Sequence, residues 1–398
     1  RDVQALVDSF GEVRPWWTDE RFGRTLLSPA GPGDFQKHEA KLRDLVKERG
    51  AEVVAAMVRN SCEHAYAARK CLVEASRISG GIAGYSLGTV RDVTSTLSGV
   101  IDDLGNLKWT EAQLRRLNAQ SLPLIVSDRQ SRCYSSGETM TVELYLSHIG
   151  PEEVPGVPLR CRLLRDGKLL ATHRTEPVAA GPGSVARAGW WSVALPQVEK
   201  PARLQLVLEV EGGSRNAWPV WVFPTIRQGS ASSPVVHDPE DRLRHLGLKR
   251  FSTGPYVMVA SRLDTVVEDH LRSGGNVLLI DPDGKAFRSH ETPFWREVAV
   301  ERASRDLFAA FPWTGAVDLQ FFRLGTGKAY DAVSGPATRS LFRTINCRTL
   351  QQNDLVVEKR YGNGLLVATV LNFGGEDNVA GEYLLDRLLH HLVIHTSR

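Results

Sequence analysis

The sequence predicts a multidomain protein that joins α/β parts to an all-β part. Three observations support this fold class. The chain has 398 residues, whereas a single domain usually holds roughly 100–200 residues. Short segments of alternating polar and apolar residues recur between residues 129 and 224, which is typical of half-buried strands. A strand–helix–strand order follows residue 230 and indicates a parallel sheet. We therefore expect three domains, at residues 1–128, 129–224 and 225–398.

Composition restricts the partners and cofactors of the chain. The net charge is +3, from 49 basic and 46 acidic side chains. This near balance gives no electrostatic reason to expect nucleic acid or an anionic membrane as a partner. No apolar run reaches the ~18 residues that a membrane span needs. The five cysteines are widely spaced and form no CxxC motif, so we expect free thiols, no metal site and no cofactor.

The first domain begins with two expected helices. Residues 34–78 are rich in Ala, Glu, Lys and Arg, with apolar residues at helical spacing, and Gly50 separates two stripes. The short apolar segment from Gly80 to Thr89 predicts a strand buried on both faces, as in a parallel barrel. A further helix is expected from Thr110 to Asn118, with Thr110 as its N-cap.

The second domain is expected to be a β-sandwich of immunoglobulin type, because several short strands separated by turn signals lie within about 95 residues. The cysteine pair of antibody domains is absent. Successive residues on a strand face opposite sides, so at most one of Trp190 and Trp191 can point into the core. The expected strands cover 140–146, 159–164, 190–195, 204–210 and 218–222.

The third domain is expected to contain a βαβ unit. Residues 256–260 and 276–281 are short apolar strands on either side of an amphipathic helix at 263–271. Gly362-Asn363-Gly364 is a strong hairpin signal between strands at 355–359 and 365–371. A helix at 382–393 ends the domain.

Five short motifs follow one another between residues 73 and 108: Val73-Glu74-Ala75-Ser76-Arg77, Ile82-Ala83-Gly84-Tyr85, Arg91-Asp92, Ser98-Gly99-Val100-Ile101-Asp102-Asp103 and Lys108. Their order and spacing resemble the end of the catalytic barrel in glycoside hydrolase family 2, the β-galactosidase-like enzymes. Members of that family usually carry a Trp near the end of the last barrel strand, where this chain has Leu87-Gly88-Thr89.

The resemblance has three implications. Residues 1–128 would be the C-terminal end of a (β/α)8 barrel, with residues 82–89 as its last strand. A retaining glycosidase needs two carboxylates about 5–5.5 Å apart, and the resemblance locates both glutamates upstream of Arg1. No catalytic residue is therefore expected here. Separately, the first residue is Arg1 rather than Met, so the chain is expected to begin inside a longer gene product or after processing.

Five residues are candidates for sugar contact. Arg91 and Asp92 follow the expected last strand, where barrel enzymes build their sites. Arg14, Trp16 and Trp17 form an aromatic–cationic cluster. Such a cluster suits a sugar, because an indole face can stack on a pyranose ring and a guanidinium donates hydrogen bonds to its hydroxyls. Two alternatives remain open. Asp92 can instead fix its loop by binding backbone amides, and the two tryptophans can be ordinary packing.

The third domain also resembles the α/β domain related to class I amidotransferases that some sugar hydrolases carry. That chemistry requires a nucleophilic cysteine on a strand-to-helix elbow. Cys347 has no such elbow around it, so this domain is expected to be non-catalytic. The pairs His237-Asp238 and His390-His391 are expected to be core or surface residues, since a metal site needs more ligands.

The resemblance implies part of a retaining glycoside hydrolase that cleaves β-glycosidic bonds, in a β-galactoside or a related sugar. The chain would supply one wall of the active site and two accessory domains. The alternative is a non-catalytic carbohydrate-binding or assembly segment, since no complete catalytic set is present. The expected partners are a carbohydrate and the missing N-terminal part of the same protein, and a homo-oligomer is left open. The chain alone is expected to be inactive and to need that part for solubility.

Overall fold

The computed structural model describes residues 32–79, 82, 84–86, 88–92, 98–102, 104–226, 233–251, 253, 256–292, 298–301, 307, 311–312, 318–333, 335, 337–346, 349–375 and 377–396. The side chains of 32–39, 298–301 and 395–396 are not described. The described part combines helices with several β-sheets, as expected for a multidomain protein with α/β and all-β regions. None of its helices is long and apolar enough to cross a membrane.

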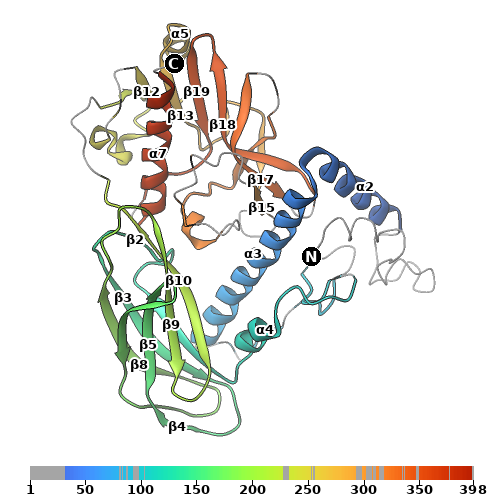
Figure 1. Ribbon diagram of the computed structural model, residues 1–398, viewed down its shortest axis with the longest axis vertical. Coiled ribbons are helices and arrows are strands. Elements are labelled where there is room, and N and C mark those ends of the chain that lie inside the picture. The colour runs from blue at the N-terminus through green and yellow to red at the C-terminus, as the bar shows by residue number, and fades with distance from the viewer. Residues whose placement is uncertain are drawn as a thin grey trace.

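Two helices meet at Gly50. Helix α2 (Pro32–Arg49) and helix α3 (Ala51–Ile78) are separated by this glycine, whose φ of 86° suits a residue without a side chain. Helix α3 has 28 residues and is therefore about 42 Å long. It runs from the C-terminal domain to the sandwich (Figure 1), with Met57 in a cluster with Ile345 near one end and Arg77 against the sandwich at the other.

The expected helix after Thr110 is confirmed. Helix α4 (Glu111–Leu117) begins with a capping box. The Thr110 hydroxyl accepts a hydrogen bond from the Gln113 backbone, and the Gln113 side chain accepts one from the Thr110 backbone.

The expected buried strand at residues 80–89 is wrong. Among the described residues of this segment there is no strand, and Ile82 and Tyr85 are 53% and 38% exposed. The segment is followed only by isolated bridges, from Arg91 to Ile101 and from Ile101 to Leu107. A barrel strand is buried because strands on both sides and helices outside cover it. The described residues supply no such neighbours and form no barrel.

The middle of the chain forms two main β-sheets whose inner faces share one core, with Tyr134, Leu144, Trp191 and Trp218 among its residues. All five strands expected here are confirmed, and Trp191 is the inward member of its pair. Strand β1 belongs to the sandwich although it precedes residue 129. The first sheet has the order β1 (Ser121–Ser127), β3 (Thr139–His148), β8 (Ser184–Ala194). The second has the order β2 (Cys133–Ser135), β10 (Arg215–Phe223), β9 (Ala202–Val210), β5 (Leu159–Arg165), β6 (Lys168–Arg174). Strands β4 (Val154–Val157) and β7 (Val178–Ala180) form a small ribbon.

The C-terminal domain contains a mixed sheet, in which the parallel part expected from the βαβ unit continues into a larger antiparallel part. Strands β11 (Val235–His237), β12 (Val257–Ala260), β13 (Asn276–Ile280) and β19 (Gly364–Thr369) are parallel neighbours. The hairpin at Gly362, whose φ is 58°, then reverses the direction between β18 (Gln352–Tyr361) and β19. The antiparallel half also holds β14 (Ser289–Glu291), β15 (Val298–Glu301), β16 (Lys328–Asp331) and β17 (Thr338–Asn346).

Helices lie beside this sheet. Helix α5 (Thr265–Arg272) connects β12 to β13, as the βαβ pattern predicts, and helix α7 (Val379–Thr396) is drawn in red against the parallel half (Figure 1). The described residues of this domain also form three short 3-10 helices: η3 (Arg244–Leu246), η4 (Leu248–Arg250) and η5 (Leu319–Phe321). The largest core cluster of the described residues lies between these elements and extends to Trp221 and Phe223 of β10, which ties the domain to the sandwich.

Candidate functional site

Asp92 forms a nearly buried ion pair with Lys108. The Lys108 ammonium lies 2.5 Å from Oδ2 and donates to Oδ1 at 2.7 Å, and the Gly99 backbone N–H also donates to Oδ1 at 2.7 Å. The exposed fractions of the two charged side chains are 5% and 13%. Both carboxylate oxygens of Asp92 are therefore occupied by this chain's own groups, Oδ1 by two hydrogen bonds and Oδ2 by the ion pair.

Backbone hydrogen bonds hold the loop that Asp92 begins. The Asp92 N–H donates to the Ile101 carbonyl at 2.9 Å, and the Lys108 N–H donates to the Val100 carbonyl at 3.0 Å. Gly99 is required at the crossing point, since a Cβ there would lie 2.4 Å from Asp92 N. The Asp102 side chain closes the following turn by accepting from the backbone N–H of Leu104 and Asn106.

Burial sets the electrostatics of this loop. Desolvation raises the pKa of Asp92, although the Lys108 ion pair and the Gly99 N–H oppose the shift. Burial likewise lowers the pKa of Arg69, which the charge of Asp92 partly offsets. The Arg69 guanidinium lies over the Trp109 ring, 4.7 Å from its centroid. These contacts agree with the alternative that Asp92 fixes its loop by binding a backbone amide. Contact between Asp92 and a sugar stays a prediction.

The other predicted site residues are only partly described. Arg91 lies beside Asp92 in the bridge to Ile101, and its Nη2 is 3.7 Å from the place that a Cβ would take at Gly105. The side chain of Arg91 therefore lies over the turn that Asp102 closes. Arg14, Trp16 and Trp17 lie outside the described residues. The structure thus describes two of the five predicted site residues, Arg91 and Asp92. The contribution of the other three to an active-site wall stays a prediction.

Sequence reasoning missed the role of Glu74 and Arg77, which fasten helix α3 to the sandwich. The Glu74 carboxylate accepts from Trp218 Nε1 at 2.9 Å and from Asn216 Nδ2 at 2.6 Å, and it pairs with Lys70. The Lys70 ammonium also lies 4.5 Å from the centroid of the Trp218 ring. The motif Glu-x-x-Arg was visible in the sequence, but the sandwich partners of Glu74 lie 142 and 144 positions away, and those of Arg77 lie 42 to 70 positions away.

The buried Arg77 guanidinium makes the second half of this fastening. It donates to the backbone carbonyls of Ala119, Gln120 and Ser147 at 2.5, 3.0 and 2.9 Å, and to the Ser147 hydroxyl at 3.1 Å. Burial lowers the pKa of Arg77. Four acceptors around one planar guanidinium fix the position of α3 on the sandwich.

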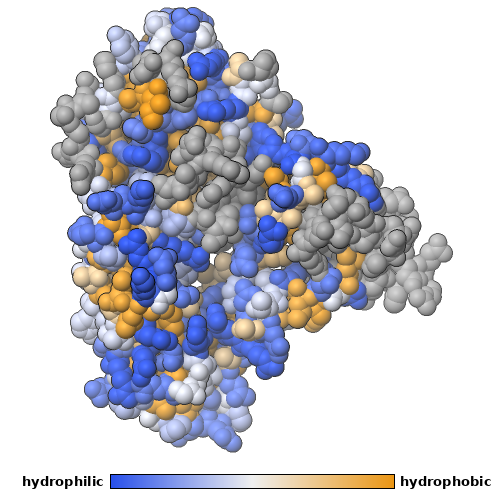
Figure 2. Space-filling view, in the orientation of Figure 1, coloured by the Kyte–Doolittle hydropathy of each residue, from blue (hydrophilic) through white to orange (hydrophobic). Residues whose placement is uncertain are grey.

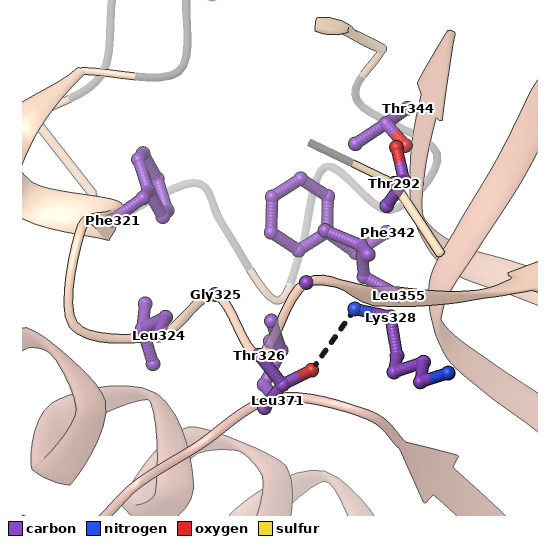
Figure 3. A pocket seen from close by; sticks show the side chains of 11 residues that line it. Thr292, Phe321, Leu324, Gly325, Thr326, Lys328, Phe342, Thr344, Leu355 and Leu371 are labelled. Atoms are coloured by element: carbon purple, nitrogen blue, oxygen red, sulfur yellow. Dashed lines mark hydrogen bonds between the residues drawn. The ribbon is translucent and has the colours of Figure 1, made fainter. Parts of the chain in front are cut away.

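Two pockets of the described part lie away from the predicted site residues. One lies inside the C-terminal domain, where Phe321 and Phe342 face each other across it and the hydroxyls of Thr292 and Thr344 stand at one side (Figure 3). It holds about 20 Å³, which is room for about one water molecule. The other is an open groove of about 390 Å³ between helix α2 and residues 349–352. Neither contains a predicted site residue.

The carboxyl ends of the parallel strands carry several aspartates, which is where ligands bind in open α/β sheets. Asp281 and Asp264 among them bind other groups of the same domain. Asp281 accepts from the backbone N–H of Lys285 and Ala286 and from the Tyr330 hydroxyl, at 3.0, 2.7 and 2.9 Å. Asp264 accepts from His237 Nε2 at 2.9 Å and caps helix α5. These contacts are consistent with an accessory domain.

The described residues form no group of three or more side chains that could hold a metal ion. His237 pairs with Asp264, and His391 pairs with Glu358 at 2.6 Å. His390 is exposed. Cys347, the one cysteine considered as a nucleophile, lies outside the described residues.

Comparison with known proteins gives one family match and several distant structural ones. A family model described as a domain of unknown function, DUF8488, matches residues 138–224, which lie in the sandwich. No curated protein matches the chain.

Solved structures with weak similarity include sugar-acting enzymes. A Paenibacillus cycloisomaltooligosaccharide glucanotransferase is 9% identical with a TM-score of 0.22, over 34% of this chain and 19% of the enzyme. A Listeria innocua β-glucosidase is 14% identical with a TM-score of 0.20, over 26% of this chain and 16% of the enzyme. The CARDB domain of a Pyrococcus furiosus protein is 15% identical with a TM-score of 0.20, over 26% and 91% of the two chains. The chain thus spans less than a fifth of either enzyme, and scores this low carry no argument about function.

Proposed function

We propose that this chain is part of a retaining glycoside hydrolase resembling family 2, which cleaves β-glycosidic bonds in a β-galactoside or a related sugar. The supporting observation is the set of contacts that joins Asp92 to Gly99, Ile101 and Lys108, which comes directly after an exposed apolar segment. The chain contributes one wall of the active site, made by Arg14, Trp16, Trp17, Arg91 and Asp92. The catalytic glutamates belong to a barrel part outside these 398 residues.

The exposed apolar surface supports a missing partner segment. Five large apolar side chains, one on α3 and four between α3 and α4, are well exposed. Hydrophobic surface is visible over this region in Figure 2. Such a surface, next to a loop held by a buried ion pair, is what a barrel strand and its neighbours would cover. The residues and their exposed fractions are Leu72 (68%), Ile82 (53%), Tyr85 (38%), Val90 (70%) and Leu107 (55%).

In this proposal Asp92 is a positioning residue. Its ion pair with Lys108 and its bond to Gly99 hold the backbone at Arg91, so that the Arg91 side chain is presented at a fixed place. The covalent step belongs to a carboxylate pair about 5–5.5 Å apart. The chain's own part is to bind and orient the sugar, with the sandwich as an immunoglobulin-like domain and residues 225–398 as a non-catalytic accessory domain similar to class I amidotransferase-like domains.

The test compares this chain with the product of its complete gene on aryl β-galactosides and aryl β-glucosides. We expect the complete product to hydrolyse at least one of them with retention of the anomeric configuration, followed by NMR. We expect no turnover by this chain alone. The proposal fails if the complete product hydrolyses none of them. It also fails if this chain alone is active and one Glu→Gln change within it abolishes the activity.

A further inference from the structure

We infer that the outer face of the sheet β1–β3–β8 is a binding surface for a neutral glycan, with Trp190 as its stacking platform. Trp190 is 60% exposed and stands on an edge strand of a rigid sandwich. Its sequence neighbour Trp191 is 8% exposed and belongs to the core. The inference does not depend on the proposed glycosidase activity and concerns a face separate from the Arg91–Lys108 loop.

A β-bulge brings the polar partners of this platform to the same face. Trp190 is paired with Glu143, and Arg187 is paired with Tyr145, so three steps along β8 correspond to two along β3. Without the extra residue, Arg187 and Trp190 would face opposite sides of the sheet. Gly189, with a φ of 125°, makes this backbone path possible. Bulges are frequent beside binding sites because they re-aim side chains.

The side chains around Trp190 form a preorganised hydrogen-bonding surface. Arg187 Nη2 donates to Glu143 Oε1 at 2.8 Å, and the Tyr145 hydroxyl donates to Glu143 Oε2 at 2.5 Å. On the other side of the platform, the hydroxyls of Thr141 and Ser192 lie 2.7 Å apart. Glu143 and Arg187 are 41% and 54% exposed, so each keeps donor or acceptor capacity for a ligand.

The chemistry of this surface favours a sugar over other occupants. Its two charges cancel, and the Glu143 carboxylate disfavours a polyanion such as nucleic acid. A protein partner usually docks on an apolar centre with several anchors, whereas the strand register places one further well-exposed apolar side chain of the described residues, Val126 at 43%, in the row of Trp190. One flat indole beside a carboxylate, a guanidinium and hydroxyls matches a pyranose ring, which has an apolar C–H face and a rim of hydroxyls.

The experiment is affinity electrophoresis of the full 398-residue chain in native gels that contain soluble β-galactan, β-mannan, xylan or β-glucan. We expect at least one polysaccharide to retard the wild type. Trp190→Ala should weaken that binding by about tenfold, the scale of one lost aromatic contact. Trp190→Phe should keep part of it, and Glu143→Gln should weaken it. The matched control is Leu169→Ala, which removes a side chain that is 56% exposed on the opposite sheet, and it should behave as the wild type.

Three results would overturn the inference. The first is no retardation of the wild type by any of the four polysaccharides. The second is equal retardation of the wild type and Trp190→Ala. The third is a wild type that self-associates in sedimentation and loses only this property in Trp190→Ala, which would assign the face to a second copy of the chain. Trp190→Phe and Glu143→Gln keep the test valid if Trp190→Ala fails to fold.

Discussion

The Asp92–Lys108 pair shows how much one nearly buried charge can matter. In Asp92→Asn the amide oxygen still accepts from the Gly99 N–H, but the Lys108 ammonium, 13% exposed, loses its counter-charge. We expect unfolding to become easier by about 3 kcal/mol, the scale for breaking a buried pair from one side. Urea unfolding followed by tryptophan fluorescence measures this change.

The matched control for that substitution is Glu111→Gln. It breaks the exposed pair between Glu111 and Arg115, whose side chains are 70% and 78% exposed, and such pairs contribute about 0.5 kcal/mol or less. If both substitutions shift the urea midpoint equally, the Asp92 pair has no special role in the loop.

The lowered pKa of Glu358 leads to a prediction of how the stability of the C-terminal domain changes in acid. Burial raises the pKa of Glu358, but hydrogen bonds from His391 and Arg339 outweigh it and lower the pKa to about 2. A carboxyl with a depressed pKa stabilises the fold above its ordinary pKa, and this stability is lost as the pH falls toward about 2. The loss amounts to about 3 kcal/mol for this shift.

Glu358→Gln removes the titrating group. Its thermal midpoint should therefore lie below that of the wild type at neutral pH, and the gap should close as the medium is acidified to about pH 2. Scanning calorimetry over that range measures it. A gap that stays constant with pH would contradict the assignment of the pKa shift to this group.

The structural roles of some residues could be predicted from the sequence, and those of others could not. Thr110 and Gly50 act through neighbours within four positions, so residue type alone revealed the cap and the helix break. Glu74 binds Asn216 and Trp218, which are 142 and 144 positions away. Nothing in a single sequence links residues so distant, so the carboxylate could be seen but not its function.

Arg77 holds the last turn of helix α3 on the sandwich with several hydrogen bonds. In Arg77→Lys an ammonium replaces the planar guanidinium and cannot reach the carbonyls of Ala119, Gln120 and Ser147 together. We expect a loss of about 2 kcal/mol in the free energy of unfolding. Arg115→Lys, on an exposed pair of α4, is the control and should change it little. An equal loss in both variants would show that α3 is held by other contacts.

The bulge in β8 gives a prediction about the same strand that carries Trp190. Gly189→Ala places a Cβ on a residue with a φ of 125°, which costs about 1–3 kcal/mol of strain. We expect a lower thermal midpoint and weaker retention by the glycan that binds the wild type. Gly181→Ala is the matched control, since it has ordinary φ and no atom within 4 Å of the new Cβ. A Gly189→Ala variant as stable as the control would mean that the bulge is not strained.

Elements with a local signal were predicted, and elements defined by their neighbours were not. The alternation in residues 140–146 and the glycines at 362–364 specify a strand and a hairpin by themselves. The segment at 82–89 has the composition of a buried strand, but burial of a parallel strand depends on strands elsewhere. The mixed sheet was missed for the same reason, because no local pattern tells whether β18 pairs with β19 alone or with β16 and β17 as well.

Helix α3 is the element that connects the whole molecule. Its first half packs near Ile345 of the C-terminal domain, and its last turns bind the sandwich through Glu74 and Arg77. The sandwich and the C-terminal domain also share a core cluster through Trp221. The exposed Leu72 lies between these attachments, so the fixed parts of the molecule present an apolar face that a further segment can cover.

That face yields a prediction for the chain alone. Exposed apolar surface binds hydrophobic dyes and favours association, so the wild type should bind anilinonaphthalene sulfonate and self-associate as its concentration rises. Leu72→Lys combined with Val90→Lys charges two positions that are 68% and 70% exposed. We expect this variant to bind less dye and to sediment as a smaller species, with an unchanged thermal midpoint because neither side chain belongs to a core.

The matched control for the double variant is Val266→Lys combined with Ile394→Lys, which adds the same charge at positions 51% and 49% exposed on α5 and α7. Net charge alone improves solubility, so the control separates that general effect from the loss of a specific surface. If the control lowers dye binding and association as much as the α3–α4 variant, the surface around Leu72 and Val90 is not a contact for a missing segment. A larger effect at Leu72 and Val90 supports a barrel part that packs there and completes the sugar site.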